Sequence, residues 1–436
     1  MIQETRRADG IYITDENGKR YTTLNEIASC LGYQNKKFLE KLHVCLDNCM
    51  IGHVPGVGKE KKRLLQRLLD EANGDFNKAY LMGIGGEAVD YAVKIARRAT
   101  GKEEIISFWH ALHGRSYAGA SLSGVALRKS GFGNPMPGII MVPYPSEEAE
   151  QFAETEGVLG PFAFLEKQLQ YASAGSLAAI IIEPIQALGG MVSPSKEAMQ
   201  DLRKLCDEKG ALLIFDEIQC GSGRCGSMYS YQQFGVVPDI VLLGKGLSNG
   251  MGYGAMLLNE RASCGVIEAA LKGGCSDNEF ACGVTNVVLD IYQEEKVFEN
   301  VKKQGNLFQT QLYQGLSKNP IVKQISGRGL GIGIGLEAGY AEIVQQQLFE
   351  KGILIGVSED YLLIRPPYII REEETMYCAD IIIQTLNEVY QIQNAETKEK
   401  KYDLNQRRPV LIPETTYASN EMMREDISKT RRKVTI

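Results

Sequence analysis

Three uninterrupted apolar runs constrain the fold of this chain more than any other feature of its sequence. They are LAAIIIE at 177–183, ALLIFDE at 211–217 and DIVLLGK at 239–245. Runs without alternating polar residues are typical of strands covered on both faces, as in a parallel sheet between helices. A helical pattern with a glycine stop, at 196–210, separates the first two runs. The sequence therefore predicts an α/β fold built on a mainly parallel, doubly wound sheet.

The length of 436 residues exceeds that of one typical compact core and predicts at least two domains. We expect residues 56–272 to form a large α/β domain. The pattern then changes to helices followed by a glycine-punctuated strand at 321–337, so we expect 273–395 to form a smaller α+β domain, with 1–55 as its N-terminal part. Residues 396–436 carry ten Lys or Arg and seven Asp or Glu, which predicts a flexible polar tail. A segment that docks on a partner subunit is the alternative.

Composition and charge exclude several classes of function. The net charge of −6 gives no electrostatic reason to expect nucleic acid or an anionic membrane as a partner. No apolar run approaches the roughly 20 residues that span a bilayer, and the polar N-terminus lacks the apolar core of a signal peptide. The ten cysteines form no CxxC pair, and the four histidines show no metal-ligand spacing. We therefore expect a cytoplasmic protein with reduced thiols and no metal.

An acid and a lysine stand at the ends of two apolar runs. Asp216 ends one and Lys245 ends the other, and functional groups gather at the carboxyl ends of parallel strands. Burial lowers the pKa of a lysine and favours its nucleophilic neutral form. The alternative is a lysine whose stem covers apolar surface while its ammonium group reaches water.

A glycine cluster precedes the helical pattern that Gly101 ends. In GIGGEAVDY, Gly85 and Gly86 would present backbone N–H groups at the positive end of the helix dipole, where phosphate binds. Glycine turns before helices are common, so this feature alone says little. A phosphate site, a strand-end acid and a strand-end lysine are together the three groups that pyridoxal phosphate uses.

The segment 211–256 resembles the class III, or omega, aminotransferases, which are fold-type I enzymes that depend on pyridoxal phosphate. DEIQCGSGRCG, VVPDIVLL and GKG follow the family pattern nearly position by position. Weaker matches, such as ALHGRS at 111–116 and IIIEPIQALGG at 180–190, extend the resemblance over about residues 80–390. It implies a large domain with a mainly parallel sheet, a smaller α+β domain, and a homodimer whose active sites lie between subunits.

The resemblance also assigns roles to single residues. Lys245 would be the catalytic lysine that forms a Schiff base with the cofactor and carries the proton. Asp216 would pair with the pyridinium nitrogen, and Gln219 would hydrogen-bond the ring hydroxyl. The other positions that match cofactor-binding residues are Gly85, Gly86, Leu112, His113 and Ser276.

Several of these positions depart from the family pattern. Leu112 stands where the family stacks an aromatic ring on the cofactor. The leucine loses the stacking energy, which is worth ~0.5–1.5 kcal/mol. Leu188 replaces a glutamate that in many members masks or releases the carboxylate-binding arginine. Ser276 is the best surviving hydroxyl in GGCSDNEFACG, the segment that would bring a Thr or Ser from the neighbouring subunit to the phosphate. A hydrogen-bonded core histidine is the alternative for His113, and we expect Glu183 to be a buried structural acid.

Two arginines bear on the substrate, because a guanidinium group grips a carboxylate bidentately. Arg365, in LLIRPPYII, matches the family position that binds the α-carboxylate of glutamate or 2-oxoglutarate. Arg115 matches the position that binds a distal or alternative carboxylate in omega-amino-acid members. A structural ion pair is the alternative for each.

The sequence therefore predicts a pyridoxal-phosphate-dependent aminotransferase that moves an amino group between an amino acid, or another amine, and a 2-oxo acid. An amino-acid racemase or epimerase, or a decarboxylating transaminase, is an alternative at the same lysine. A non-catalytic protein that keeps the fold and binds the cofactor or a partner is an alternative of another class. The expected partners are small-molecule substrates and a second copy of the chain, without nucleic acid or membrane.

Overall fold

The computed structural model describes residues 2, 4–52, 56–146, 160–271 and 274–404. Residues Met1–Val389 form one compact unit, and Tyr390–Ile436 form a second. Within the described part of the chain, no helix is long and apolar enough to cross a membrane, and no cluster of side chains is suited to hold a metal ion.

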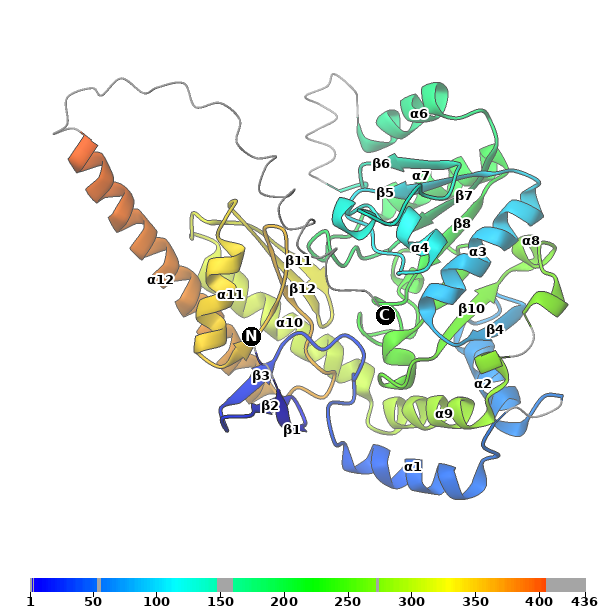
Figure 1. Cartoon of the computed structure of the whole chain (residues 1–436), viewed down its shortest axis with the longest axis horizontal. Helices are drawn as coiled ribbons and strands as arrows, with labels where there is room; N and C mark the ends of the chain where they lie inside the picture. The colour runs from blue at the N-terminus through cyan, green and yellow to red at the C-terminus, as the bar shows by residue number, and fades with distance from the viewer. Residues whose placement is uncertain (1, 3, 53–55, 147–159, 272–273, 405–436) are drawn as a thin grey trace, which may run out of the picture. The chain divides into compact units, whose positions relative to one another are not determined.

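A seven-stranded sheet forms the centre of the first unit (Figure 1). Its strand order is β4-β10-β9-β8-β7-β5-β6; the last five strands run parallel, whereas β10 is antiparallel to β4 and to β9. The predicted mainly parallel sheet is thereby confirmed. The strands are β4 (Lys78–Met82), β5 (Glu104–Phe108), β6 (Ile139–Val142), β7 (Leu177–Ile182), β8 (Leu212–Asp216), β9 (Ile240–Leu243) and β10 (Gly254–Leu258).

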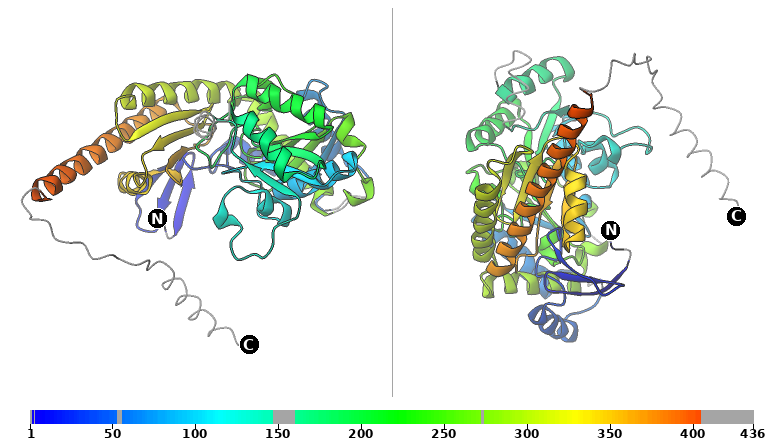
Figure 2. Two further views of the ribbon diagram at one scale, coloured as in Figure 1. Left: turned by 90° about the horizontal axis from the view of Figure 1, so that it is seen from above. Right: turned by 90° about the vertical axis from the view of Figure 1, so that its left-hand side faces the viewer.

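The uninterrupted apolar runs form strands that are buried on both faces. Every residue of β7, β8, β9 and β10 is buried. Alternate side chains, such as Ile181 and Ile214, join a core cluster with α3 (Gly85–Thr100). Helix α7 (Lys196–Lys209) contacts β7 and β8 as well, and helices lie on both sides of the sheet (Figure 2). Helices α3 and α7 end at left-handed glycines, Gly101 and Gly210, as their glycine stops predict.

The remaining helices complete the first unit. The α-helices are α1 (Lys36–Asn48), α2 (Lys59–Glu71), α4 (Tyr117–Leu122), α6 (Gly160–Ala172), α8 (Glu260–Ser263), α9 (Glu279–Glu294), α10 (Val297–Leu316) and α11 (Ala341–Glu350), and α12 (Glu372–Leu404) continues beyond this unit. The short 3-10 helices are η1 (Ala126–Arg128), η2 (Tyr231–Gln233), η3 (Lys245–Ser248), η4 (Glu268–Ala270) and η5 (Gly274–Asp277).

Two four-stranded sheets accompany the central one. The first, in the order β11-β12-β15-β14, consists of β11 (Val322–Arg328), β12 (Gly331–Leu336), β15 (Tyr361–Ile364) and β14 (Gly356–Ser358). The second joins β1 (Thr5–Asp9), β2 (Tyr12–Asp15) and β3 (Arg20–Thr23) to β13 (Ile353–Leu354), which pairs parallel with β3. This pairing supports our proposal that the N-terminal segment belongs with the C-terminal small domain.

Two expectations need correction. The expected single strand at 321–337 is instead the antiparallel hairpin β11–β12, because Gly329, at φ +55°, lets the chain reverse. Helix α12 continues past residue 395, where we expected a flexible tail to begin. Residues 405–436 of that expected tail lie outside the described residues.

The close approach of α10 to the β11–β12 turn gives a test of the fold. Replacing a helical glycine by alanine usually stabilises a helix by about 1 kcal/mol. A Cβ on Gly305, however, would lie 2.1 Å from the backbone oxygen of Gly329. We expect Gly305→Ala to lower the free energy of unfolding by about 1–3 kcal/mol.

The matched control is Gly315→Ala on the same helix, where the three atoms nearest to an added Cβ all belong to the side chain of Ile383. A side chain yields to a clash more readily than a backbone carbonyl does, so we expect a smaller loss. Urea denaturation of both variants provides the measurement. Equal effects of the two substitutions would contradict the packing described here.

Candidate active site

Lys245 lies where β9 has ended and the chain turns sharply. Its backbone has φ +45°, in the left-handed region, and it begins η3. The side-chain Nζ donates a hydrogen bond to Gln219 Oε1 at 2.5 Å. Burial lowers the pKa of Lys245 to about 8, although the nearby acids Glu183 and Asp216 oppose this shift. The lysine is therefore a neutral amine over much more of the accessible pH range than an exposed lysine.

Asp216 ends β8 with its carboxylate buried and hydrogen-bonded. Its Oδ2 accepts from His113 Nδ1 at 2.7 Å, and its Oδ1 accepts from the backbone N–H of Ile218 at 3.1 Å. Because a carboxylate only accepts, this contact assigns the proton of the ring to Nδ1. The Nε2 atom of His113 is buried and has no partner among the described residues. His113 thus orients Asp216 from one side.

Glu183 is a buried acid that bonds to the backbone of two segments. Its two carboxylate oxygens accept from the backbone N–H groups of Leu112 (2.8 Å) and Ala187 (3.1 Å). Burial raises the pKa of Glu183 to about 7. The acid therefore holds the segment 111–113 against the loop that follows β7.

The N-terminus of α3 faces the same strand ends. The N-cap, Ile84, provides no side-chain acceptor for the first N–H groups of the helix. A Cβ on Gly85 would meet the side chain of Ile218 at 2.9 Å, and a Cβ on Gly244 would meet it at 3.1 Å. Gly85, Ile218 and Gly244 therefore lie against one another. This packing brings the predicted phosphate turn to the residue that precedes Lys245.

Arg365 follows β15 and reaches the site from another sheet. Its Nη2 donates to Asn25 Oδ1, and its Nε is buried without a partner among the described residues. Burial, and secondarily the positive charge of Arg224, lowers the pKa of Arg365 to about 10. Arg365 also lowers the pKa of Lys245, so the two cations lie within electrostatic range. The structure thus brings Arg365 together with the predicted lysine.

Three of the buried polar atoms without a partner belong to this cluster. The described residues contain six such side-chain atoms, and His113 Nε2, Gln219 Nε2 and Arg365 Nε are among them. Buried polar atoms are normally hydrogen-bonded, so a concentration of unpaired ones indicates a site that a ligand completes.

The remaining predicted residues are Leu112, Ser276 and Arg115. Leu112 is half-buried and Ser276 is buried in η5, next to the hydroxyl of Tyr253. Arg115 is exposed and lines a cavity of about 560 Å³ together with Gly114, Ser116 and Tyr117.

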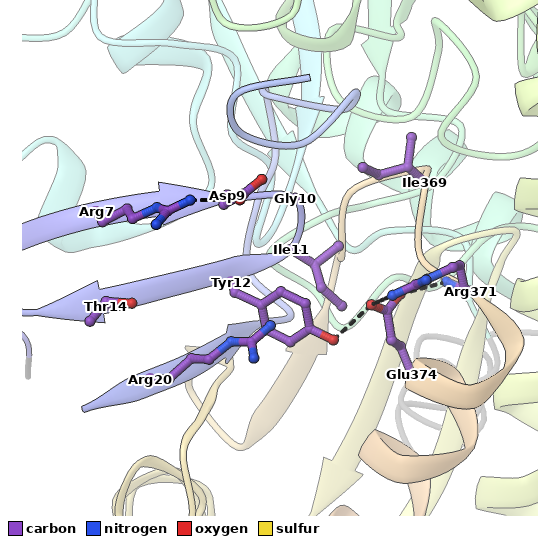
Figure 3. A pocket seen from close by; sticks show the side chains of 10 residues that line it. All are labelled: Arg7, Asp9, Gly10, Ile11, Tyr12, Thr14, Arg20, Ile369, Arg371 and Glu374. Atoms are coloured by element: carbon purple, nitrogen blue, oxygen red, sulfur yellow. Dashed lines mark hydrogen bonds and ion pairs between the residues drawn. The ribbon is translucent and has the colours of Figure 1, made fainter. Parts of the chain in front are cut away.

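A separate hollow of about 600 Å³ lies between the N-terminal strands and α12 (Figure 3). Its charged groups are partnered within the hollow: Arg7 with Asp9 and Arg371 with Glu374, while the guanidinium of Arg20 stacks on a tyrosine ring. None of the predicted site residues lines it, so we do not place the active site there.

Reasoning from the sequence missed two residues of the site, Asn25 and Ile218. Ile218 stands two positions after Asp216 within DEIQ, so its position could have been noted. Asn25 lies outside every motif quoted in the sequence analysis. Its contact with Arg365 joins residues that are 340 positions apart, which no local pattern reveals.

The cluster fits pyridoxal phosphate. The first N–H groups of α3, which no side chain caps, suit a phosphate; Asp216 suits the ring nitrogen, and the unpaired Gln219 amide suits the ring hydroxyl. Lys245 is a buried amine of lowered pKa within reach of the same groups.

Comparison with known proteins gives the same answer. Residues 1–386 match the family described as aminotransferase class-III. The acetylornithine aminotransferase of Bacillus subtilis (strain 168) is 30% identical over 375 residues, covering 85% of this chain and 91% of the relative. That of Agrobacterium fabrum is 31% identical over 381 residues, covering 84% and 89%.

Solved structures of transaminases share the fold. The taurine:2-oxoglutarate aminotransferase of Bifidobacterium kashiwanohense, in complex with PLP and glutamate, has a TM-score of 0.80 at 26% identity and covers 89% of this chain and 93% of its own. The omega transaminase of Pseudomonas jessenii, in complex with PMP, has a TM-score of 0.81 at 26% identity with the same coverage. This chain therefore belongs to the class III aminotransferases, and it transfers amino groups between amino acids and oxo acids with pyridoxal phosphate as its cofactor.

Proposed function

We propose that Lys245 is the catalytic lysine, that Arg365 binds the substrate carboxylate, and that the acceptor is a dicarboxylic 2-oxo acid such as 2-oxoglutarate. The observation that carries this proposal is the state of Arg365. It is 7% exposed, and it forms no ion pair with an acid among the described residues.

A buried guanidinium without a counter-ion is costly, because burial removes the hydration of the charge. The neutral amide of Asn25 satisfies one donor but supplies no negative charge. An incoming carboxylate would supply that charge and would also pair with the free Nε in a bidentate contact. Arg365 therefore has the properties of a carboxylate receptor rather than of a structural ion pair.

Each residue of the cluster has a role in amino-group transfer. The bound cofactor supplies an electron-withdrawing ring and an aldehyde. Asp216, held by His113, would keep a proton on the ring nitrogen, and the α3 N-terminus would hold the phosphate. Lys245 Nζ, neutral above about pH 8, would accept the proton from the substrate Cα and deliver it to the cofactor carbon. Gln219 keeps this amine in place through the hydrogen bond from Nζ.

The relatives support a carboxylate acceptor. One structural neighbour is named as a taurine:2-oxoglutarate aminotransferase, and the curated relatives are named for acetylornithine. A 2-oxo dicarboxylate would place one carboxylate at Arg365, and we assign the other to the exposed Arg115. Racemisation and decarboxylation at the same lysine are favoured by no observation in the structure.

The lowered pKa of Lys245 leads to a pH-dependent rate of cofactor binding. Only the neutral amine attacks the cofactor aldehyde, so raising the pH through about 8 should accelerate covalent binding to the apoprotein. The measurement is the rate at which the visible absorbance of bound cofactor appears in stopped-flow mixing at a series of pH values. Lys245→Ala is the control that should show no covalent phase. A midpoint near about 10.5, as for an exposed lysine, would contradict the assignment.

The role of Arg365 is tested by Arg365→Gln, which removes the charge and keeps hydrogen-bonding capacity. Loss of a charged hydrogen-bonded contact costs about 1.5–3 kcal/mol, so we expect KM for 2-oxoglutarate to rise about 10-fold to 150-fold. Steady-state assays with single amino donors provide the measurement, and Arg371→Gln, an exposed arginine in the separate hollow, is the control. An unchanged KM for Arg365→Gln would refute the role of Arg365, whereas no conversion of any donor by the wild type would refute the substrate assignment.

We also propose a homodimer in the cytoplasm. Leu127 and Phe132 are each 82% exposed and line the same cavity as Gly114 and Arg115. A second copy would cover this apolar surface beside the phosphate turn. The nine cysteines other than Cys275 all carry free thiols, which suits a reducing compartment.

The dimer is tested by sedimentation of the double variant Leu127→Asp/Phe132→Asp. We expect the wild type to sediment at twice the mass of the chain and the variant to dissociate, because two buried charges would destabilise the interface. Tyr313→Asp, at another exposed aromatic residue, is the control and should remain dimeric. A monomeric wild type would contradict the proposal.

A further inference from the structure

Asn25 is held beside Arg365 by the backbone as well as by its side chain. The N–H of Arg365 donates to the oxygen of Leu24 at 2.6 Å, and the N–H of Glu26 donates to the oxygen of Arg365 at 2.8 Å. These two bonds form an isolated parallel bridge between Asn25 and Arg365. Whatever side chain occupies position 25 is therefore fixed next to the guanidinium group.

Gly356 on β14 provides the space for this pair. A Cβ at this glycine would lie 2.6 Å from Arg365 Nη2 and 2.7 Å from Asn25 Oδ1. Three segments thus converge on one hydrogen bond: Asn25, two residues after β3, Arg365, directly after β15, and Gly356 on β14. The contact is consequently an integral part of the packing and not a chance surface contact.

The amide of Asn25 has a defined orientation. Arginine donates and never accepts, so Oδ1 must face Arg365 and the NH₂ group must face away from it. Asn25 is exposed, whereas Arg365 is buried. The asparagine therefore stands at the rim, orients the guanidinium group, and leaves its positive charge uncompensated.

An acid in place of Asn25 would change the receptor. A carboxylate at this position would form an ion pair with Arg365 and would repel an incoming carboxylate. Leu188 likewise places no charge at the position where many family members carry a glutamate. Within the described part of the chain, nothing acidic pairs with Arg365 when substrate is absent.

We propose that Asn25 is a specificity-determining residue: as the neutral partner of Arg365, it restricts both half-reactions to substrates that carry a carboxylate. The inference rests on the proposed role of Arg365. An amine without a carboxylate would leave the buried cation unpaired in the complex, so such amines should be poor donors. The enzyme would accordingly take α-amino acids as donors and 2-oxo acids as acceptors at one shared carboxylate site.

The test compares Asn25→Asp, Asn25→Ala and the matched control Asn306→Asp. Asn306 is exposed on α10 and gives the same change of charge away from the site. The probe is glutarate, an inert dicarboxylate, whose Kd for the holoenzyme is measured by isothermal titration calorimetry. We expect Asn25→Asp to raise this Kd by about 10-fold or more, since a charged contact is replaced by repulsion. Asn25→Ala should stay within about 3-fold of the wild type, and Asn306→Asp within about 2-fold.

A second readout follows the donors. The wild type should convert an α-amino acid much faster than the corresponding amine that lacks the carboxylate. Asn25→Asp should lower the ratio of these two rates by about 10-fold. Equal glutarate affinity of Asn25→Asp and wild type would overturn the inference, as would an Asn25→Ala variant that loses as much affinity as Asn25→Asp. Because glutarate binding requires no turnover, this result is independent of whether the wild type converts any donor, which is the separate test of the proposed function.

Discussion

Two basic groups, Lys245 and Arg365, are buried at one site. Burying a positive charge costs free energy, and the surrounding residues offset this cost to different degrees. Desolvation lowers the pKa of both groups. The cost is partly offset at Lys245, where the negative charges of Glu183 and Asp216 act. At Arg365 it is not offset, because the charged group with the largest influence there is Arg224, which is also positive. Because of this difference, Lys245 can lose its proton and act as a neutral amine. Arg365 stays a charged guanidinium and can bind an anion.

The sheet makes this arrangement possible. Parallel strands end at a common edge, so Asp216 at the end of β8 and Lys245 just beyond β9 become neighbours without any long connection. The close packing of Gly85, Ile218 and Gly244 then brings the N-terminus of α3 to the same edge. Arg365 arrives from the sheet that contains β15, and its register is set by backbone bonds to the segment after β3. The site is therefore assembled from groups held by three different sheets.

The sequence predicted the parts of the site that local patterns encode. The apolar runs indicated the parallel sheet, and Asp216, Lys245, Gly85 and Gly86 followed from their positions at strand and helix ends. The hairpin β11–β12 was missed because a single left-handed glycine, Gly329, decides between one strand and two.

Contacts between distant segments could not be predicted in the same way. The hydrogen bond between Asn25 and Arg365 depends on tertiary packing, and nothing in either local sequence specifies it. The hydrogen bond between His113 and Asp216 likewise depends on tertiary packing, because it joins the loop after β5 to the end of β8. The resemblance suggested His113 as a candidate, but only the geometry shows which carboxylate it contacts.

The central claim is that Lys245 is the residue to which the cofactor bonds. The most direct measurement is borohydride reduction of the holoenzyme, followed by proteolysis and mass spectrometry of the labelled peptide. Our account predicts that the pyridoxyl group is found on Lys245, the lysine that directly follows VLLG in the sequence. A label on any other lysine, or no label on a protein shown to hold the cofactor, would contradict it.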